Sequence, residues 1–142
     1  MAASQFRIEL REVEINWRAV KTDLTRALSG RLAIEARLAE RASTYRRRRR
    51  MQAASPGPPS VVFDDDASGN ATVLVVRAVT KVGILHRISK ALSELGLDIR
   101  HATVQTIGME VVDTFYVRAN GELVTDPAYR KEIQRALLHA VA

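Results

Sequence analysis

The amino-acid sequence predicts a small α+β domain in its second half. Three observations support this: a segment of alternating apolar residues from Thr72 to Ala78, an apolar stripe at helical spacing after Gly83, and two strand-like segments around residues 108–110. A period of two residues is typical of a strand, whereas spacings of three and four residues are typical of a helix. The predicted order is strand, helix, strand, strand, with almost no sequence between the elements.

A glycine joins the first strand to the first helix. Val73, Val75 and Val76 give the strand the β-branched residues that strands favour. After the glycine, one side of a helix is marked by Ile84, Leu85, Ile88, Ala91, Leu92 and Leu95. Gly96 then ends the helix, because glycine adopts a left-handed backbone without steric cost.

Two further strands and a helix complete the predicted domain. The second strand covers Leu97 to Ile107, and its apolar positions change phase between Ile99 and Ala102, which indicates a β-bulge. Residues 108–110 close a hairpin into a third strand, residues 111–118. After a turn at Asn120 and Gly121, we expect Thr125 or Asp126 to cap a last helix that has Pro127 in its first turn. Its buried side is marked by Tyr129, Ile133, Ala136, Leu137, Ala140 and Val141.

Four phrases of the sequence resemble a known family. They are DDASGNAT at residues 65–72, GILHRI at 83–88, GLDIR at 96–100 and VDTFYV at 112–117. With the order of elements, they resemble the ACT domain, and more closely the C-terminal ACT domain of the bifunctional PII uridylyltransferase/uridylyl-removing enzymes. The resemblance implies a ferredoxin-like βαββα fold that senses an amino acid, glutamine in this case.

The resemblance also accounts for the first half of the chain. Phe6, Ile8 and Leu10 alternate like a strand; Asn16 precedes a helical stripe that stops at Ser29 and Gly30; and a second helical segment covers residues 31–48. We expect residues 1–50 to be the remnant of a first ACT-like domain, residues 51–60 a Pro/Gly/Ser linker, and residues 61–142 the ACT domain. The chain would then be the tail of a longer protein.

An ACT domain usually has four strands, and no sequence after the last helix is left to form the fourth. The segment Val61-Val62-Phe63 is the obvious substitute. We expect it to pair as a short extra strand on the open edge of the sheet, which would otherwise expose unpaired backbone groups.

Composition sets broad limits. The 142 residues are 46% hydrophobic, which is enough for a core, and the chain has no cysteine to form a disulfide or a thiolate site. No apolar run reaches the length of a membrane span, and no signal peptide is recognisable. A cytoplasmic protein without membrane partners is expected.

The basic charge is concentrated at one end. Residues 1–51 hold 13 Lys+Arg against 6 Asp+Glu, whereas residues 52–142 hold 9 against 10. The run Arg46 to Arg50 is open to two interpretations, phosphate binding on nucleic acid or a solvated helix end. No aromatic residue lies among these arginines and a flexible linker follows them, so the solvated end is favoured and nucleic acid is not the expected partner.

The sequence shows no self-contained catalytic or metal site. A nucleotidyltransferase needs paired carboxylates for Mg²⁺, and a metal phosphohydrolase needs a His/Asp cluster. His86, His101 and His139 have no paired ligand spacing and are interpreted as structural or surface residues. The run Asp64 to Asp66 lies in turn-forming sequence and is interpreted as a solvated turn, and the lone Asp113 as structural. No catalytic residue, metal or cofactor is expected, and the chain is not expected to be an enzyme.

The candidate ligand-binding residues form the turn between the first strand and the first helix: Thr80, Lys81, Val82, Gly83, Ile84 and Leu85. A glycine there lets backbone approach a ligand, and the N–H groups at a helix start suit a carboxylate. In the resembled family this turn usually reads Asp-x-Pro-Gly. Thr80 stands in place of that Asp and Val82 in place of that Pro, so a structural turn that binds no ligand is the alternative.

Two functional classes follow. The first is a regulatory module that binds an amino acid and acts in nitrogen control, with the PII signal protein or catalytic domains as partners in trans. The second is a structural or oligomerisation module, or a gene remnant, that binds no ligand. A homo-oligomer is expected in both cases, because the apolar stripe of Trp17, Val20 and Leu24 would otherwise face water.

Overall fold

A computed structural model describes residues 5, 7, 14–49 and 57–142, without the side chains of residues 45–49. The chain divides into two compact units, Met1–Arg37 and Leu38–Ala142. The strand predicted at Phe6, Ile8 and Leu10 lies outside the described residues, as does most of the predicted linker.

Two helices are described before residue 50, α1 (Trp17–Leu28) and α2 (Ile34–Arg49). The Asn16 side chain caps α1 by accepting a hydrogen bond from the Ala19 N–H at 3.1 Å, as polar N-cap residues do. α2 begins three residues later than the predicted start at Arg31, because Gly30 adopts a positive φ of 68° and the chain turns there. The apolar side of α1 lies exposed, with no buried residue along the helix.

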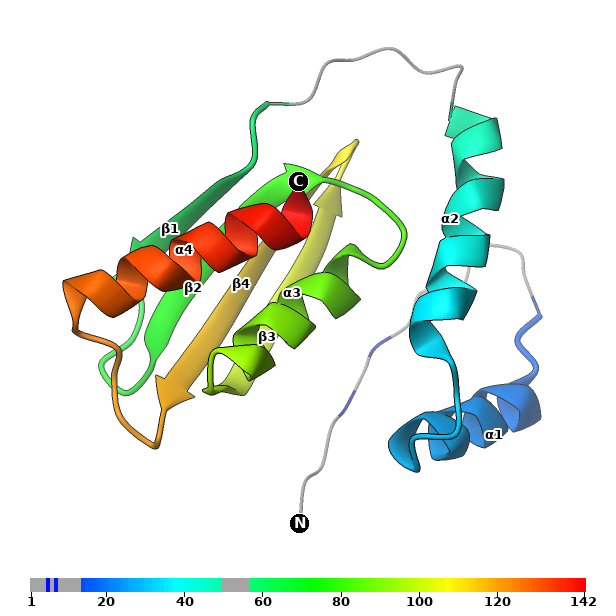
Figure 1. The fold of residues 1–142 in the computed structure, drawn as a ribbon, viewed down its shortest axis with the longest axis horizontal. Coiled ribbons are helices and arrows are strands. Elements are labelled where there is room, and N and C mark those ends of the chain that lie inside the picture. The colour runs from blue at the N-terminus through cyan, green and yellow to red at the C-terminus, as the bar shows by residue number, and fades with distance from the viewer. Residues whose placement is uncertain (1–4, 6, 8–13, 50–56) are drawn as a thin grey trace. The chain divides into compact units, whose positions relative to one another are not determined.

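The rest of the chain forms an α+β domain around a four-stranded antiparallel sheet (Figure 1). The strands are β1 (Ser60–Asp64), β2 (Thr72–Val79), β3 (Leu97–Ile107) and β4 (Glu110–Ala119), and their order across the sheet is β1-β2-β4-β3. The predicted fold class is confirmed. The extra strand is confirmed too, because β1 pairs with β2 from Ser60↔Arg77 to Asp64↔Val73.

Helices α3 (Ile84–Glu94) and α4 (Pro127–Val141) cover one face of this sheet (Figure 1). The residues that alternate toward the helices are almost completely buried: Leu74 and Val76 of β2, Phe115 and Val117 of β4, Ile88 and Leu92 of α3, and Ile133 and Leu137 of α4. Each large apolar side chain removed from water contributes roughly 1.5–3 kcal/mol, so this layer is the main source of stability.

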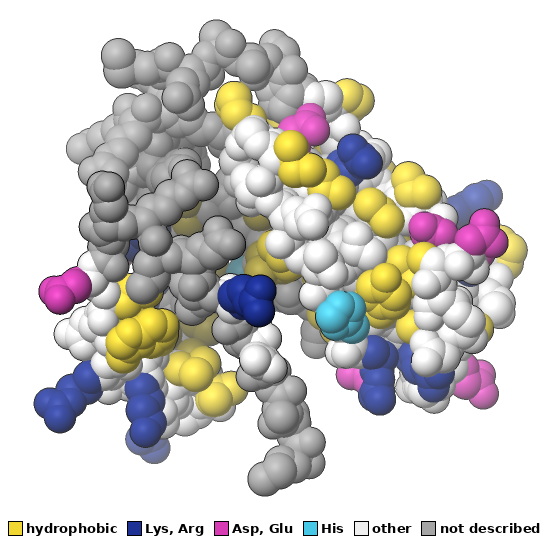
Figure 2. Space-filling model, turned by 180° about the vertical axis from the view of Figure 1, so that it is seen from behind, with side chains coloured by type: hydrophobic (Ala, Val, Ile, Leu, Met, Phe, Trp, Pro, Cys, Tyr) yellow, Lys and Arg dark blue, Asp and Glu magenta, His cyan; other side chains and the backbone are white. Residues whose placement is uncertain are grey.

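The opposite face of the sheet carries no helix and is seen in Figure 2. Val62 is 54% exposed and Ile107 is 64% exposed, and hydrophobic side chains are scattered over this side between charged groups (Figure 2). β3 is the more open edge of the sheet, since every residue of this strand after Leu97 is exposed.

The irregular positions lie where the sequence predicts them. The β3–β4 register shifts between Ile99 and His101, which confirms the bulge. Gly96 has a φ of 71° after the end of α3, and Asn120 and Gly121 have φ values of 50° and 81° in the turn before α4. Of the two predicted caps, Asp126 is the one that accepts hydrogen bonds from the first turn of α4.

Candidate functional site

The predicted site residues lie together between the end of β2 and the start of α3. Gly83 is the N-cap residue of α3 and has a left-handed backbone, with φ 81° and ψ 8°. A side chain at this φ would cost about 1–2 kcal/mol, so the backbone geometry alone accounts for glycine here. The predicted tight turn at Gly83 is confirmed.

The turn is held from both sides of the domain. The Thr80 N–H donates to the Met109 carbonyl at 2.8 Å, which fixes the turn to the β3–β4 hairpin. The Lys81 Nζ donates to the Ala142 carbonyl at 2.9 Å, which ties the turn to the end of α4. The position of this backbone is therefore set by three elements, β2, the hairpin and α4.

The start of α3 presents backbone donors. The Ile84 N–H donates to the Lys81 carbonyl at 3.2 Å, and the Ile84 side chain is buried in the core. The N–H groups of Val82, Gly83 and Leu85 have no acceptor within the described part of the chain. Unpaired N–H groups at a helix N-terminus attract carboxylates and phosphates, so the geometry suits the carboxylate of a small ligand.

The turn contains no acidic side chain for an ammonium group. Thr80 and Val82 are both half-buried, and the only charged residue among the six is Lys81. Glu110 pairs with Val79 at the end of β2, but its Oε1 accepts the Gly57 N–H at 2.9 Å. As it stands, the turn offers donors for a carboxylate and no side chain that would pair with an α-amino group.

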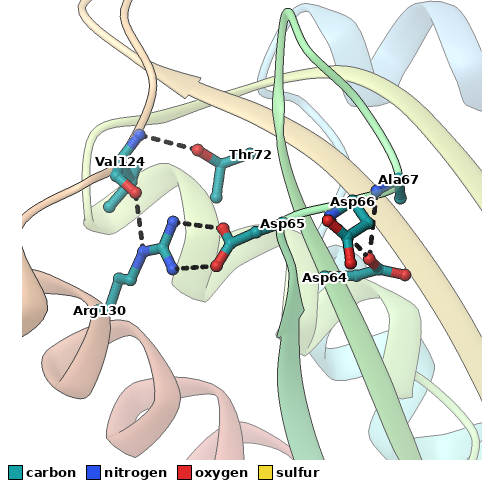
Figure 3. A network of polar contacts seen from close by, with 7 residues as sticks. All are labelled: Asp64, Asp65, Asp66, Ala67, Thr72, Val124 and Arg130. Carbon is teal, nitrogen blue, oxygen red and sulfur yellow. Dashed lines mark hydrogen bonds and ion pairs between the residues drawn. The ribbon is translucent and has the colours of Figure 1, made fainter.

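The acidic run before β2 forms a turn and an ion pair (Figure 3). Asp64 Oδ1 accepts the N–H groups of Asp66 and Ala67, each at 3.1 Å, which confirms the predicted local turn. For Asp65 the prediction of a solvated turn is wrong, because its carboxylate forms an ion pair. Its two oxygens accept from Arg130 Nη1 and Nη2 of α4 at 2.9 and 2.7 Å, in the planar geometry that arginine and carboxylate favour.

Arg130 connects several parts of the domain. Its Nε donates to the Val124 carbonyl at 2.8 Å, and its guanidinium lies 4.8 Å from the centre of the Phe63 ring. The hydrogen bonds that Arg130 donates to Asp65 lower the pKa of Asp65 and raise the pKa of Arg130. Nearby, Thr72 Oγ1 accepts the buried Val124 N–H at 2.8 Å (Figure 3). This network ties β1 and the following loop to α4.

Asp113 is a buried carboxylate on the helix-covered face of β4. Its side chain is 0% exposed, Oδ1 accepts the Gln105 N–H at a long 3.3 Å, and Oδ2 has no partner within the described residues. Burial raises the pKa of Asp113, and the Gln105 hydrogen bond opposes this more weakly. Asp113 lies between Val76 and Val104 in the ladders, among core residues, as its structural interpretation requires.

No metal site or membrane span is found in the described parts of the chain. His86, His101 and His139 lie on α3, β3 and α4, and no group of three His, Cys, Asp or Glu residues in residues 14–49 and 57–142 is placed to hold a metal ion. Within the same ranges, every helix is too short or too polar to cross a bilayer.

Comparison with known proteins agrees with the fold. Residues 72–131 match the ACT domain family. The bifunctional uridylyltransferase/uridylyl-removing enzyme of Streptomyces coelicolor is 46% identical over 98 residues, which cover 69% of this chain and 11% of that enzyme. The enzymes of the same name from Gluconobacter oxydans and Azospirillum brasilense are 42% and 36% identical, over 79% and 56% of this chain.

The chain spans about a tenth of the length of these relatives, 11% and 12% for the first two. What is shared is thus their ACT region and not the whole enzyme. From the strand order, the helix-covered sheet and this match, we conclude that residues 72–131 belong to the ACT domain family and resemble the ACT region of uridylyltransferase/uridylyl-removing enzymes.

Proposed function

We propose that this chain is a regulatory amino-acid-sensing module of nitrogen control, with glutamine as its ligand. The family match and the relatives, which are named as uridylyltransferase/uridylyl-removing enzymes, support this class of function. The PII signal protein, or catalytic domains supplied in trans, would be its partners in a cytoplasmic setting.

The observation that carries the proposal is the backbone of the Gly83 turn. Val82, Gly83 and Leu85 present N–H groups without acceptors in the described part of the chain, at the positive end of α3. Gly83 itself adds no side chain to this backbone, and the nearest side chain is that of Leu38, whose Cδ1 lies 3.3 Å from the position that a Cβ atom at Gly83 would have. A ligand carboxylate would accept from the Gly83 and Leu85 N–H groups, and the ligand side chain would lie toward Leu85, which is 40% exposed.

Isothermal titration of the whole chain with glutamine and a panel of other amino acids tests the proposal directly. The variant Thr80→Asp/Val82→Pro sharpens the test, because it adds a carboxylate for the α-amino group and stiffens the turn. Proline at position 82 removes only the Val82 N–H, which donates to no described acceptor, and it leaves the Gly83 and Leu85 N–H groups for the ligand carboxylate. A charge-assisted hydrogen bond is worth about 1.5–3 kcal/mol, so binding should strengthen at least about tenfold.

The matched control is Thr103→Asp, which adds the same charge on the exposed edge strand β3, away from the turn. It should leave amino-acid binding unchanged. Sensing is excluded for this chain when neither the natural sequence nor the double variant binds any amino acid while circular dichroism shows both to be folded. An equal gain in affinity in Thr103→Asp would mean that the added charge strengthens binding wherever it is placed, and not by contact with a ligand at the turn.

A ligand-free oligomerisation module is the second candidate, and the exposed β3 edge favours it. Val104 is 48% exposed and Ile107 is 64% exposed on a strand of 11 residues whose outer side has no ladder partner among the described strands. Such an edge is a template for pairing with another strand. On α1, Trp17 and Leu24 are 57% and 58% exposed, which gives a second apolar surface for association.

Sedimentation velocity of Val104→Lys tests this second candidate. Lysine on an edge strand opposes edge-to-edge pairing, so the variant should be a monomer at concentrations where the natural chain forms dimers. Val62→Lys is the matched control, because Val62 is a comparably exposed valine at 54%, on the edge strand at the other side of the sheet. If the natural chain stays monomeric at micromolar concentration, the prediction that it forms a homo-oligomer is wrong.

A further inference from the structure

A small, open cleft lies at the end of the sheet opposite the Gly83 turn. Its volume is about 170 Å³, and Asn70, Ala71, Arg100 and Arg118 line it. Asn70 and Ala71 precede β2, whereas the Gly83 turn follows β2, so the length of that strand separates the two places. On the open face in Figure 2, dark-blue and magenta side chains gather at one end of the domain, below a histidine.

The β-bulge of β3 contributes to this cleft. Arg118 follows the buried Val117 along β4, so its side chain lies on the face without helices. Its backbone partner in the β3–β4 ladder is Asp98. Arg100 is the residue left without a ladder partner between Ile99 and His101. Because a bulge re-aims side chains next to it, Arg100 and Arg118 come to line one cleft although they belong to different strands.

Arg118 is fixed in position without being neutralised. Its Nε donates to the Asn70 carbonyl at 2.5 Å and its Nη1 donates to the Gly121 carbonyl at 3.0 Å. Both acceptors are uncharged, and no carboxylate within the described residues forms an ion pair with Arg118. Arg118 Nη2 has no acceptor among the described residues. The guanidinium is therefore fixed in position, keeps its charge and has N–H groups that can donate to a ligand.

Arg100 and Asn70 add further donors. Arg100 Nη1 pairs with Asp98 Oδ2 at 3.0 Å, and both side chains are well exposed, so water screens this pair and weakens it. Arg100 Nε and Nη2 have no acceptor in the described part of the chain. Asn70 Oδ1 accepts from Ser68 Oγ at 2.9 Å, which leaves the Asn70 amide nitrogen as a donor without a described acceptor.

We propose that this cleft binds a small oxyanion, a phosphate or carboxylate group, at a site separate from the Gly83 turn. Two guanidinium groups and one amide supply donors, and the two arginines outweigh the one carboxylate of Asp98. Arginine forks match the paired oxygens of both anions. The volume of about 170 Å³ equals that of about six water molecules, which leaves room for the anionic group and a few further atoms of a ligand.

The test is a titration of the whole chain, ¹⁵N-labelled, with sodium phosphate and, in a second arm, sodium acetate at constant ionic strength, followed by NMR. We expect the backbone signals of Asn70, Ala71, Arg100 and Arg118 to shift together and saturate in at least one arm. The arm with the tighter saturation identifies the anion. Shifts confined to the Arg46 to Arg50 run, or shifts that do not saturate in either arm, would overturn the proposal.

Arg100→Gln should weaken this binding by roughly tenfold, because it removes one charged donor from the cleft. The matched control is Arg135→Gln, an exposed arginine of α4 whose Nη1 pairs with Glu132 at 2.7 Å and which does not line the cleft. Equal loss in both variants would show that the anion responds only to net charge. Arg118→Lys keeps the charge and loses the fork, so it should also weaken binding; unchanged affinity in both cleft variants contradicts the site.

Discussion

Asp113 offers the sharpest test of the core, because a carboxylate that is 0% exposed should make stability depend on pH in an unusual direction. Its neighbours across the ladders are Val76 and Val104, and along β4 they are Val111 and Phe115, so its described surroundings are apolar. We predict the effect of Asp113→Asn, which keeps an oxygen to accept the Gln105 N–H and removes the titratable proton.

The sign follows from the raised pKa of Asp113. In the unfolded chain the carboxyl has a pKa of about 3.9, whereas in the folded protein it keeps its proton to higher pH. The protonated form therefore stabilises the fold fully below about 3.9, and this contribution is lost as pH rises through the folded pKa. Within that window the free energy of unfolding should fall by up to about 1.4 kcal/mol per pH unit, the slope for one proton.

The variant lacks this slope but has a cost of its own. Its amide nitrogen would occupy the place of Oδ2, which has no partner among the described residues, and a buried unpaired donor costs about 1–3 kcal/mol. Asp113→Asn should thus be less stable than the natural chain at low pH, and the difference should shrink or reverse toward neutral pH.

Urea unfolding of both proteins at a series of pH values from acid to neutral measures this difference. The other carboxyl groups titrate in both proteins, so their contributions cancel when the two curves are subtracted. Asp98→Asn serves as the control, since the Asp98 side chain is 65% exposed. Parallel curves for Asp113→Asn and the natural chain, or a natural chain that gains stability relative to the variant as pH rises, would refute the reasoning.

Two further predictions concern the contacts around Arg130. Asp65→Asn removes the carboxylate whose pKa Arg130 lowers, so its contribution is present above about pH 3.9 and is lost as pH falls through the folded pKa. The thermal midpoint of Asp65→Asn should lie slightly below that of the natural chain at neutral pH and converge with it in acid, whereas Asp66→Asn should track the natural chain throughout. Thr72→Val leaves the buried Val124 N–H without its acceptor, so urea unfolding should show a loss of about 1–3 kcal/mol that Thr72→Ser largely restores.

The positions of the elements could be predicted because each has a local signal. Gly83 and Gly96 bound α3, and the change of phase after Ile99 locates the bulge to within a residue or two. The start of α2 was less well defined, since residues 31–33 have no strong breaker of their own and the turn depends on the positive φ of Gly30.

Contacts between distant residues could not be predicted in the same way. Asp65 and Arg130 are 65 positions apart, and no local sequence pattern predicts that they form an ion pair. The arginine cleft likewise depends on the register between β3 and β4 as well as on the bulge. The six residues of the Gly83 turn, in contrast, are consecutive, so their proximity follows from the chain itself and the sequence could locate the turn directly.

The unequal edges of the sheet constrain any assembly that copies of this chain could build. On the β1 side, α4 reaches the edge strand: Gln134 Nε2 donates to the Val61 carbonyl at 3.1 Å, and Arg130 lies over Phe63. The β3 side has no such cover within the described residues. If copies join through sheet edges, β3 must therefore pair with β3 of the other copy. In such a self-complementary contact the open edges of both copies are paired with each other. The product is a closed two-fold pair, whereas a contact between unlike edges would propagate into an endless ribbon.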